Sequence, residues 1–175
     1  STEDIQGHGT FVASIIAAQA DNGVGVAGVA HQANILPCMV FQEGLVSDKI
    51  GIGATDADIT KAILWAADSG AQVINLSLGS ESPNQAAQEA VDYAVSHGVI
   101  VVAAAGNNGN ATMNYPAGYR NVIGVGALGE VLDMTQSSYR LNLDKKEYWA
   151  QYSNYNTSVF VSAPGTEMYG AKLNR

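Results

Sequence analysis

Apolar strands that alternate with amphipathic helices constrain the fold of this chain most. Residues 99–104 and 122–127 are continuously apolar or small, so we expect both segments to be buried strands. Residues 58–69 and 84–96 have the apolar spacing of helices that bury one face. Strands without polar alternation are covered on both faces, and parallel sheets with crossover helices provide that cover. The pattern therefore predicts an α/β fold, a three-layer, mostly parallel twisted sheet with helices on both faces.

The remaining expected elements follow the same alternation. Glycine and polar residues mark the turns, and Asp58 is placed to cap the helix that it opens. His97 and Gly98 end the next helix. The other expected elements are a helix over 9–20, a glycine-rich turn over 21–28, a strand over 34–40, an irregular stretch over 42–55, a strand over 72–76 and a long β-hairpin over 128–155.

The composition is that of one folded, acidic domain. The chain has 175 residues, of which 47% are apolar and 14% charged, and this balance excludes a disordered chain. The formal net charge of −8 argues against binding to nucleic acid or to anionic membranes. No apolar stretch is long enough for a membrane span.

His8 is flanked by glycines at the expected start of a helix. The sequence Gly7-His8-Gly9-Thr10 is followed by apolar residues at helical spacing. The N–H groups and the dipole at a helix N-terminus disfavour an imidazolium, which leaves a neutral ring able to accept a proton. This position favours a general base.

Two other strings follow the ends of expected strands, where ligands of parallel sheets bind. They are Asn75-Leu76-Ser77-Leu78-Gly79 and Ala103-Ala104-Ala105-Gly106-Asn107. The small residues of the second string leave room for a substrate side chain. The amide of Asn107 can donate to the oxygen of a tetrahedral intermediate.

In their order and spacing, the three strings resemble the motifs of subtilisin-like serine proteases. The resemblance implies a serine endopeptidase with a Ser-His-Asp triad, a polypeptide substrate, and a secreted or cell-envelope location. It makes His8 the catalytic base and Asn107 the oxyanion donor, and the chemistry requires no cofactor. The substrate backbone would pair with the edge at residues 77–79. The implied substrate-binding residues are Ser77, Leu78, Gly79, Ala104, Ala105, Gly106 and Asn114.

In this interpretation, the residues at the base of the pocket for the substrate side chain next to the cleaved bond carry no charge. Neither Asn108 nor Asn114 is acidic, so we expect no acidic pocket that selects basic side chains.

The glycine-rich turn after the first helix matches G-x-G-x-x-G over residues 23–28. A dinucleotide motif follows a strand and opens a helix, and here the order is reversed, so we reject that interpretation. In subtilisins the matching loop binds calcium. The resemblance would assign calcium ligands to the backbone oxygens of Ala20, Val24 and Val26 and to the side-chain oxygen of Asn22. A plain structural turn is an equally good interpretation.

The resemblance covers nearly all of the chain but only the middle of a catalytic domain. The family's aspartate precedes the histidine in a D-[ST]-G context after a strand, and only seven residues precede His8. The family's serine follows A-P-G in G-T-S-M-A, and no such string follows Ala163-Pro164-Gly165 here. We therefore expect residues 1–175 to be one incomplete domain, inactive alone and able to self-associate through uncovered apolar surface. The alternative is a non-catalytic relative that binds peptides in the same groove.

Several residues have ordinary structural explanations. Cys38 lies in an apolar run and is expected in the core, and His31 and His97 are expected in a loop and a helix cap. The aromatic segment 128–155 is expected to pack at the sheet edge, with a role in binding substrate or a partner as the alternative.

Overall fold

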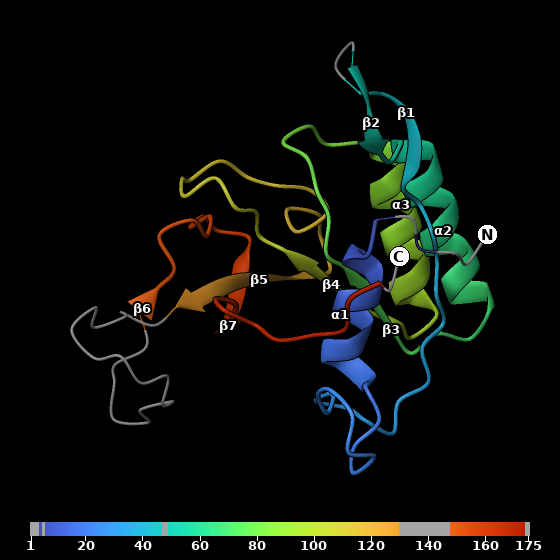
Figure 1. Ribbon diagram of the computed structural model, residues 1–175. Helices are drawn as coiled ribbons and strands as arrows, with labels where there is room; N and C mark the ends of the chain where they lie inside the picture. Colours follow the sequence, from blue (N-terminus) through green and yellow to red (C-terminus); the bar gives the residue numbers. More distant parts are fainter. Residues whose placement is uncertain (1–3, 5, 47–48, 130–147, 174–175) are drawn as a thin grey trace. The chain divides into compact units, whose positions relative to one another are not determined.

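Figure 1 shows a computed structural model of the protein, which describes residues 4, 6–46, 49–129 and 148–173. The chain divides into two compact units. Unit 1 comprises Ser1–Ile74, Asn84–Val99 and Tyr169–Arg175, and unit 2 comprises Asn75–Pro83 and Ile100–Met168.

Unit 1 contains the helices that the sequence predicts. They are α1 (His8–Ala17), α2 (Asp56–Asp68) and α3 (Gln85–Ser96). Helices α2 and α3 pack against each other and lie side by side in Figure 1. Their apolar faces form a small core, because the side chains of Ile63, Ala66, Ala87, Ala90, Val91 and Ala94 are buried.

Helix α2 begins earlier than the sequence predicted, so the assignment of Asp58 as its cap is wrong. Thr55 is the N-cap, and its hydroxyl oxygen accepts a hydrogen bond from the Asp58 N–H at 3.1 Å. The Thr55 hydroxyl donates to the Asp58 carboxylate at 2.6 Å, which makes a reciprocal pair like a capping box. Helix α3 begins as predicted, with Asn84 as N-cap.

Two predictions about the segment before α2 are wrong. Residues 34–40 form no strand. The stretch over 42–55, expected to be irregular, contains two antiparallel paired strands, β1 (Gln42–Val46) and β2 (Lys49–Gly53). A strand exists only where a neighbouring strand pairs with its backbone, and no described strand pairs with residues 34–40. Cys38, expected in the core, is exposed.

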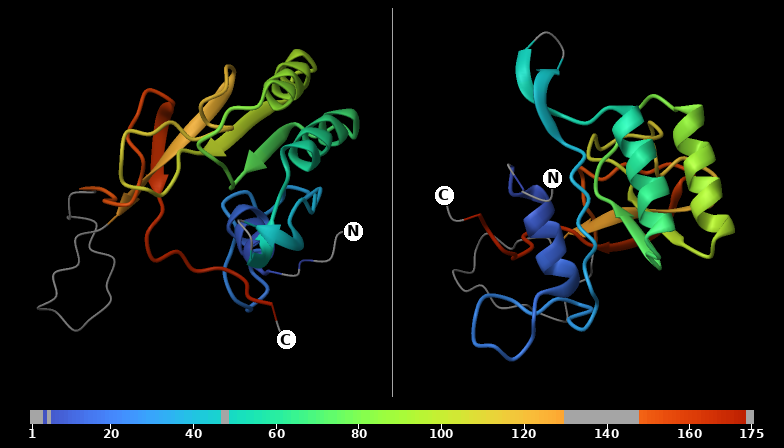
Figure 2. Two further views of the ribbon diagram at one scale, coloured as in Figure 1. Left: turned by 90° about the horizontal axis from the view of Figure 1, so that it is seen from above. Right: turned by 90° about the vertical axis from the view of Figure 1, so that its right-hand side faces the viewer.

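Unit 2 is built on a sheet in which the predicted apolar strands are parallel neighbours. Strand β4 (Ile100–Ala104) pairs with β5 (Val122–Gly129), and β5 pairs in parallel with β7 (Val159–Pro164), a strand that the sequence analysis missed. Figure 2 shows β4, β5 and β7 side by side. The strand order is β3-β4-β5-β6, with β7 also beside β5, and β3 (Val73–Leu76) enters unit 2 with its last residues. Alternate residues of β4 are buried, at Val101 and Ala103.

The predicted hairpin over 128–155 is described only at its two ends. Strand β6 (Tyr148–Trp149) pairs antiparallel with Leu128 and Gly129, as the returning strand of a hairpin would. The part of the prediction that concerns residues 130–147 lies outside the described residues. Among the residues that the structure describes, no helix is long and apolar enough to cross a membrane.

Candidate functional site

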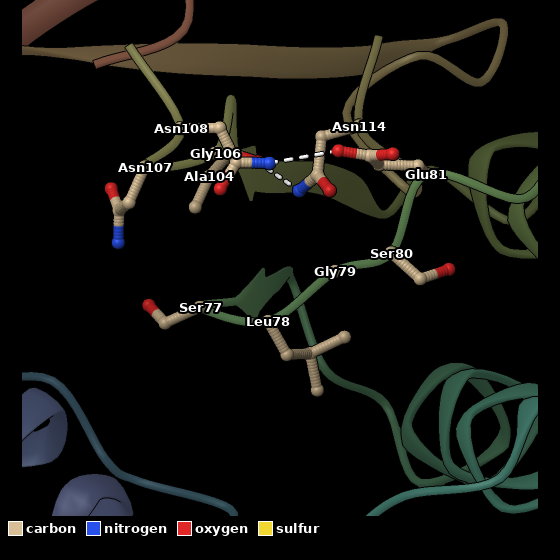
Figure 3. A pocket seen from close by; sticks show the side chains of 10 residues that line it. All are labelled: Ser77, Leu78, Gly79, Ser80, Glu81, Ala104, Gly106, Asn107, Asn108 and Asn114. Carbon is tan, nitrogen blue, oxygen red and sulfur yellow. Dashed lines mark hydrogen bonds between the residues drawn. The ribbon is translucent and has the colours of Figure 1, made fainter. Parts of the chain in front are cut away.

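A pocket of about 260 Å³ lies in unit 2, beyond the carboxyl ends of β3 and β4. This is the edge at which parallel sheets bind ligands. The predicted substrate-binding residues line this pocket, with the exception of Ala105, and they are joined by Asn107 (Figure 3). Ala105 is buried, and its N–H donates to the Val125 carbonyl at 2.9 Å. Ser80, Glu81 and Asn108 also line the pocket, and the sequence analysis did not assign them to substrate binding.

The segment predicted to pair with a substrate backbone is itself anchored at one end. Ser80 and Tyr115 exchange backbone hydrogen bonds of 2.9 and 2.7 Å. This bridge holds residues 77–79 beside Asn114, whose side chain is largely buried. The Asn114 amide donates to the Ala104 carbonyl at 3.4 Å. Asn114 lines the pocket, and its amide lies on the side of Ala104 (Figure 3).

Gly79 is required because residues 77–79 pass very close to Asn114 and Tyr115. A Cβ atom at this position would overlap the Asn114 amide and would lie 2.8 Å from the Tyr115 carbonyl oxygen. The absence of a side chain therefore allows residues 77–79 to pass close to Asn114.

One acidic side chain, which the sequence analysis did not assign to the pocket, lies among the residues that line it. The Glu81 carboxylate lies at the pocket wall and accepts a hydrogen bond of 2.8 Å from the Asn108 amide (Figure 3). Glu81 comes four residues after Ser77, so only the turn of the chain after β3 brings it back to the pocket. The sequence offered no motif that marks this residue.

Asn107 lines the pocket and lies three residues after the end of β4. Its side chain is exposed, and in Figure 3 its amide points away from the Asn108–Glu81 pair. In the part of the chain that the structure describes, no hydrogen bond engages this amide. Gly106, just before it, has a φ of 108°, a conformation that favours glycine. An amide in this position is available as a donor to a ligand in the pocket.

His8 is the first residue of α1, in unit 1, as the sequence predicted. Its N-cap Gly7 has a φ of 91° and provides no side chain to cap the helix. Asp4 replaces the missing cap, because its carboxylate accepts hydrogen bonds from the N–H groups of Gly7 and Thr10, at 2.7 Å each. The Thr10 hydroxyl donates to the same carboxylate at 2.7 Å.

These hydrogen bonds stabilise the ionised form of Asp4. The Thr10 hydroxyl, followed by the N–H groups of Gly7 and Thr10, holds the pKa of the Asp4 carboxyl well below its usual range. The sequence analysis did not identify this role of Asp4. The available signal was an acidic residue just before a helix whose cap is glycine.

The loop proposed for calcium forms tight, exposed turns. Asp21, Gly23 and Gly25 all have positive φ values, and the Asn22 side-chain oxygen accepts from the Val24 N–H at 2.9 Å. The oxygens expected to bind the ion are neutral carbonyl and amide oxygens, a type that suits Ca²⁺. Among the described residues, no group of three or more His, Cys, Asp and Glu side chains could hold a metal. The donor chemistry fits calcium in type, and binding stays a prediction.

The other histidines lie where the sequence predicted. His97 caps the C-terminus of α3 and its ring packs on Tyr93, with ring centroids 4.1 Å apart. His31 lies in an exposed turn.

The chain matches known proteases over almost its whole length. The family model described as the Subtilase family matches residues 1–175. The chain is 44% identical over 165 residues to the thermophilic serine proteinase of Bacillus sp. (strain AK1), covering 94% of this chain and 36% of that protein. It is 40% identical to thermitase of Thermoactinomyces vulgaris, covering 93% of this chain and 50% of that protein. The chain thus spans half or less of the length of these relatives.

Solved structures give the same result. Sphericase matches with a TM-score of 0.79 and 32% sequence identity, covering 97% of this chain and 56% of that chain. A structure named S41 psychrophilic protease matches with a TM-score of 0.77 and 31% identity, covering 97% of this chain and 55% of that chain. These matches confirm the α/β fold class predicted from the sequence. Because the family model covers every residue, the chain belongs to the subtilase family of serine proteases.

Proposed function

We propose that this chain supplies the histidine, the substrate-binding strand and the oxyanion asparagine of a subtilisin-like serine endopeptidase. In this proposal a serine outside the 175 residues attacks the peptide carbonyl. His8 takes the proton from the serine hydroxyl and passes it to the leaving amine. Asn107 donates a hydrogen bond to the oxygen on which negative charge develops. Residues 77–79 pair with the backbone of a polypeptide substrate.

The observation that carries the proposal is the convergence of two separate motifs on one pocket. Ser77, Leu78 and Gly79 follow β3, Asn107 follows β4, and all of them line the same cavity. A backbone edge for an extended peptide and an unengaged amide donor are the two features that an acyl-transfer site needs next to its nucleophile. The chain's membership of the subtilase family supports the same chemistry.

Asn107 provides the test of this proposal. In the full-length protein, Asn107→Leu should lower kcat for a peptide substrate strongly and change KM little, because the lost hydrogen bond forms only in the transition state. In subtilisin itself the loss of this donor costs about 2.7–4 kcal/mol, so a kcat reduced about 100- to 1000-fold is expected. A variant that mainly raises KM would contradict the oxyanion role.

The isolated 175-residue chain belongs in the same experiment. It contains no G-T-S-M-A string, so we propose that it shows no turnover and no labelling by a fluorophosphonate. Stoichiometric labelling of this chain would contradict the proposal. Binding of peptides by the full-length protein without turnover would instead favour the non-catalytic alternative.

Calcium and location are further parts of the proposal. Calcium would be bound by the backbone oxygens of Ala20, Val24 and Val26 and by the Asn22 side chain, and would stabilise the loop after α1 without taking part in the chemistry. A melting temperature that chelation leaves unchanged would contradict this site.

Secretion or attachment to the cell envelope is proposed from the family alone, and detection of the protein only inside the cell would contradict it.

A further inference from the structure

Asn154 is a completely buried polar residue in unit 2 that none of the motifs includes. Its side chain is 0% exposed. Its backbone N–H and both polar groups of its side chain have partners in the loop that follows β4. Burying an amide stabilises a protein only if its hydrogen bonds are made, so these contacts fix the loop against Asn154.

The hydrogen bonds of Asn154 flank Asn107 on both sides. The Asn154 N–H donates to the Gly106 carbonyl at 3.0 Å. The Asn154 side-chain oxygen accepts from the Asn108 N–H at 2.8 Å. Gly106 and Asn108, on either side of Asn107, are therefore both hydrogen-bonded to Asn154. Gly106 bonds to its backbone and Asn108 to its side chain.

A further hydrogen bond joins Asn154 to a later part of the same loop. The Asn154 amide donates to the Thr112 carbonyl at 3.1 Å. Gly106 lies so close that a Cβ there would come within 2.5 Å of the Asn154 amide nitrogen. The positive φ of Gly106 and its missing side chain are thus both needed for the loop to reach Asn154.

We infer that Asn154 is a positioning residue, which holds the backbone on either side of Asn107 so that the Asn107 amide faces the developing oxyanion. The inference rests on the proposed function of Asn107. An exposed side chain with no protein partner of its own has its direction set by its backbone, and Asn154 fixes that backbone. A donor displaced by about 1 Å can cost up to about 100-fold in rate.

The test compares two neighbouring asparagines in the full-length protein. Asn154→Ser is too short to keep the bonds to Asn108 and Thr112, and we expect kcat to fall about 10- to 100-fold with KM nearly unchanged. Asn156→Ser is the matched control, because Asn156 also donates to the Thr112 carbonyl, at 2.8 Å, and its side-chain hydrogen bonds involve neither Gly106 nor Asn108. An equal loss of kcat in both variants, or a normal kcat in Asn154→Ser, would overturn the inference.

A conservative variant and a double mutant separate positioning from folding. Asn154→Asp keeps an oxygen that can accept from the Asn108 N–H, so it should retain more of the kcat than Asn154→Ser. If Asn154 acts through Asn107, adding Asn154→Ser to Asn107→Leu should cause little further loss of kcat. Additive losses, or failure of both Asn154 variants to fold, would overturn the positioning role.

The same set of variants separates the two proposals. A lowered kcat in Asn107→Leu combined with a normal kcat in Asn154→Ser overturns only the inference about Asn154. A normal kcat in Asn107→Leu overturns the oxyanion role itself, and with it the basis for a positioning residue.

Discussion

At the scale of single residues, the pocket combines amide groups with one carboxylate. Asn108 and Asn114 line it, and the hydrogen bond from Asn108 holds the Glu81 carboxylate at its wall. The Glu81 side chain is exposed, so solvent screens its charge and its effect on a ligand is modest. If the proposed function holds, negative charge at this place would favour a positively charged substrate side chain over a neutral one.

Glu81→Gln tests this effect and leaves an acceptor for Asn108. If the proposed function holds, the variant should lower the preference for Lys or Arg on the amino side of the cleaved bond about two- to fivefold in kcat/KM. The loss should be larger at low salt, because screening is weaker there. Glu89→Gln, on α3, is a charge-matched control outside the pocket. An unchanged ratio between basic and neutral substrates would contradict this role.

At the scale of elements, the structure shows which predictions a sequence supports. The ends of α3 were predictable because Asn84 and His97-Gly98 act locally. Helix α2 begins at Asp56, with Thr55 rather than Asp58 as its N-cap. Strands depend on partners far along the chain, so residues 34–40 were assigned wrongly and β7 was missed. The pocket residues within the motifs were predictable from the sequence. Glu81 and Asn154 belong to no motif, and only the three-dimensional fold places them beside the pocket and its loop.

The start of α1 depends on the charge of Asp4. Its pKa lies below the usual value of 3.8, so its stabilising effect is complete above that pH and is lost as the pH falls toward its lowered pKa. Asp4→Ala should therefore lower the free energy of unfolding at pH 7, by on the order of 1 kcal/mol or less for this incompletely buried side chain. The difference in the free energy of unfolding between Asp4→Ala and the unmodified protein should become smaller below about pH 4. Urea unfolding of the full-length protein from pH 7 to pH 3 measures it, and a difference that does not change with pH would contradict this account.

At the scale of the whole molecule, the chain is a subtilase segment that spans half or less of the length of the relatives compared here. Its fold class and family were predictable because three motifs occur in the right order. Self-association of the isolated chain stays a prediction. It is consistent with exposed apolar side chains such as Phe160 on β7, which is 78% exposed. A strictly monomeric chain across a range of concentrations in sedimentation measurements would contradict it.

The most direct test of the account is the turnover of a peptide substrate by the full-length protein with His8→Ala. The account predicts a kcat lower by several orders of magnitude in a folded protein, because no other group takes the serine proton. His31→Ala, a change in an exposed turn, is the matched control and should leave kcat unchanged. A His8→Ala protein with a near-normal kcat would contradict the assignment of His8 as the catalytic base and the proposed function with it.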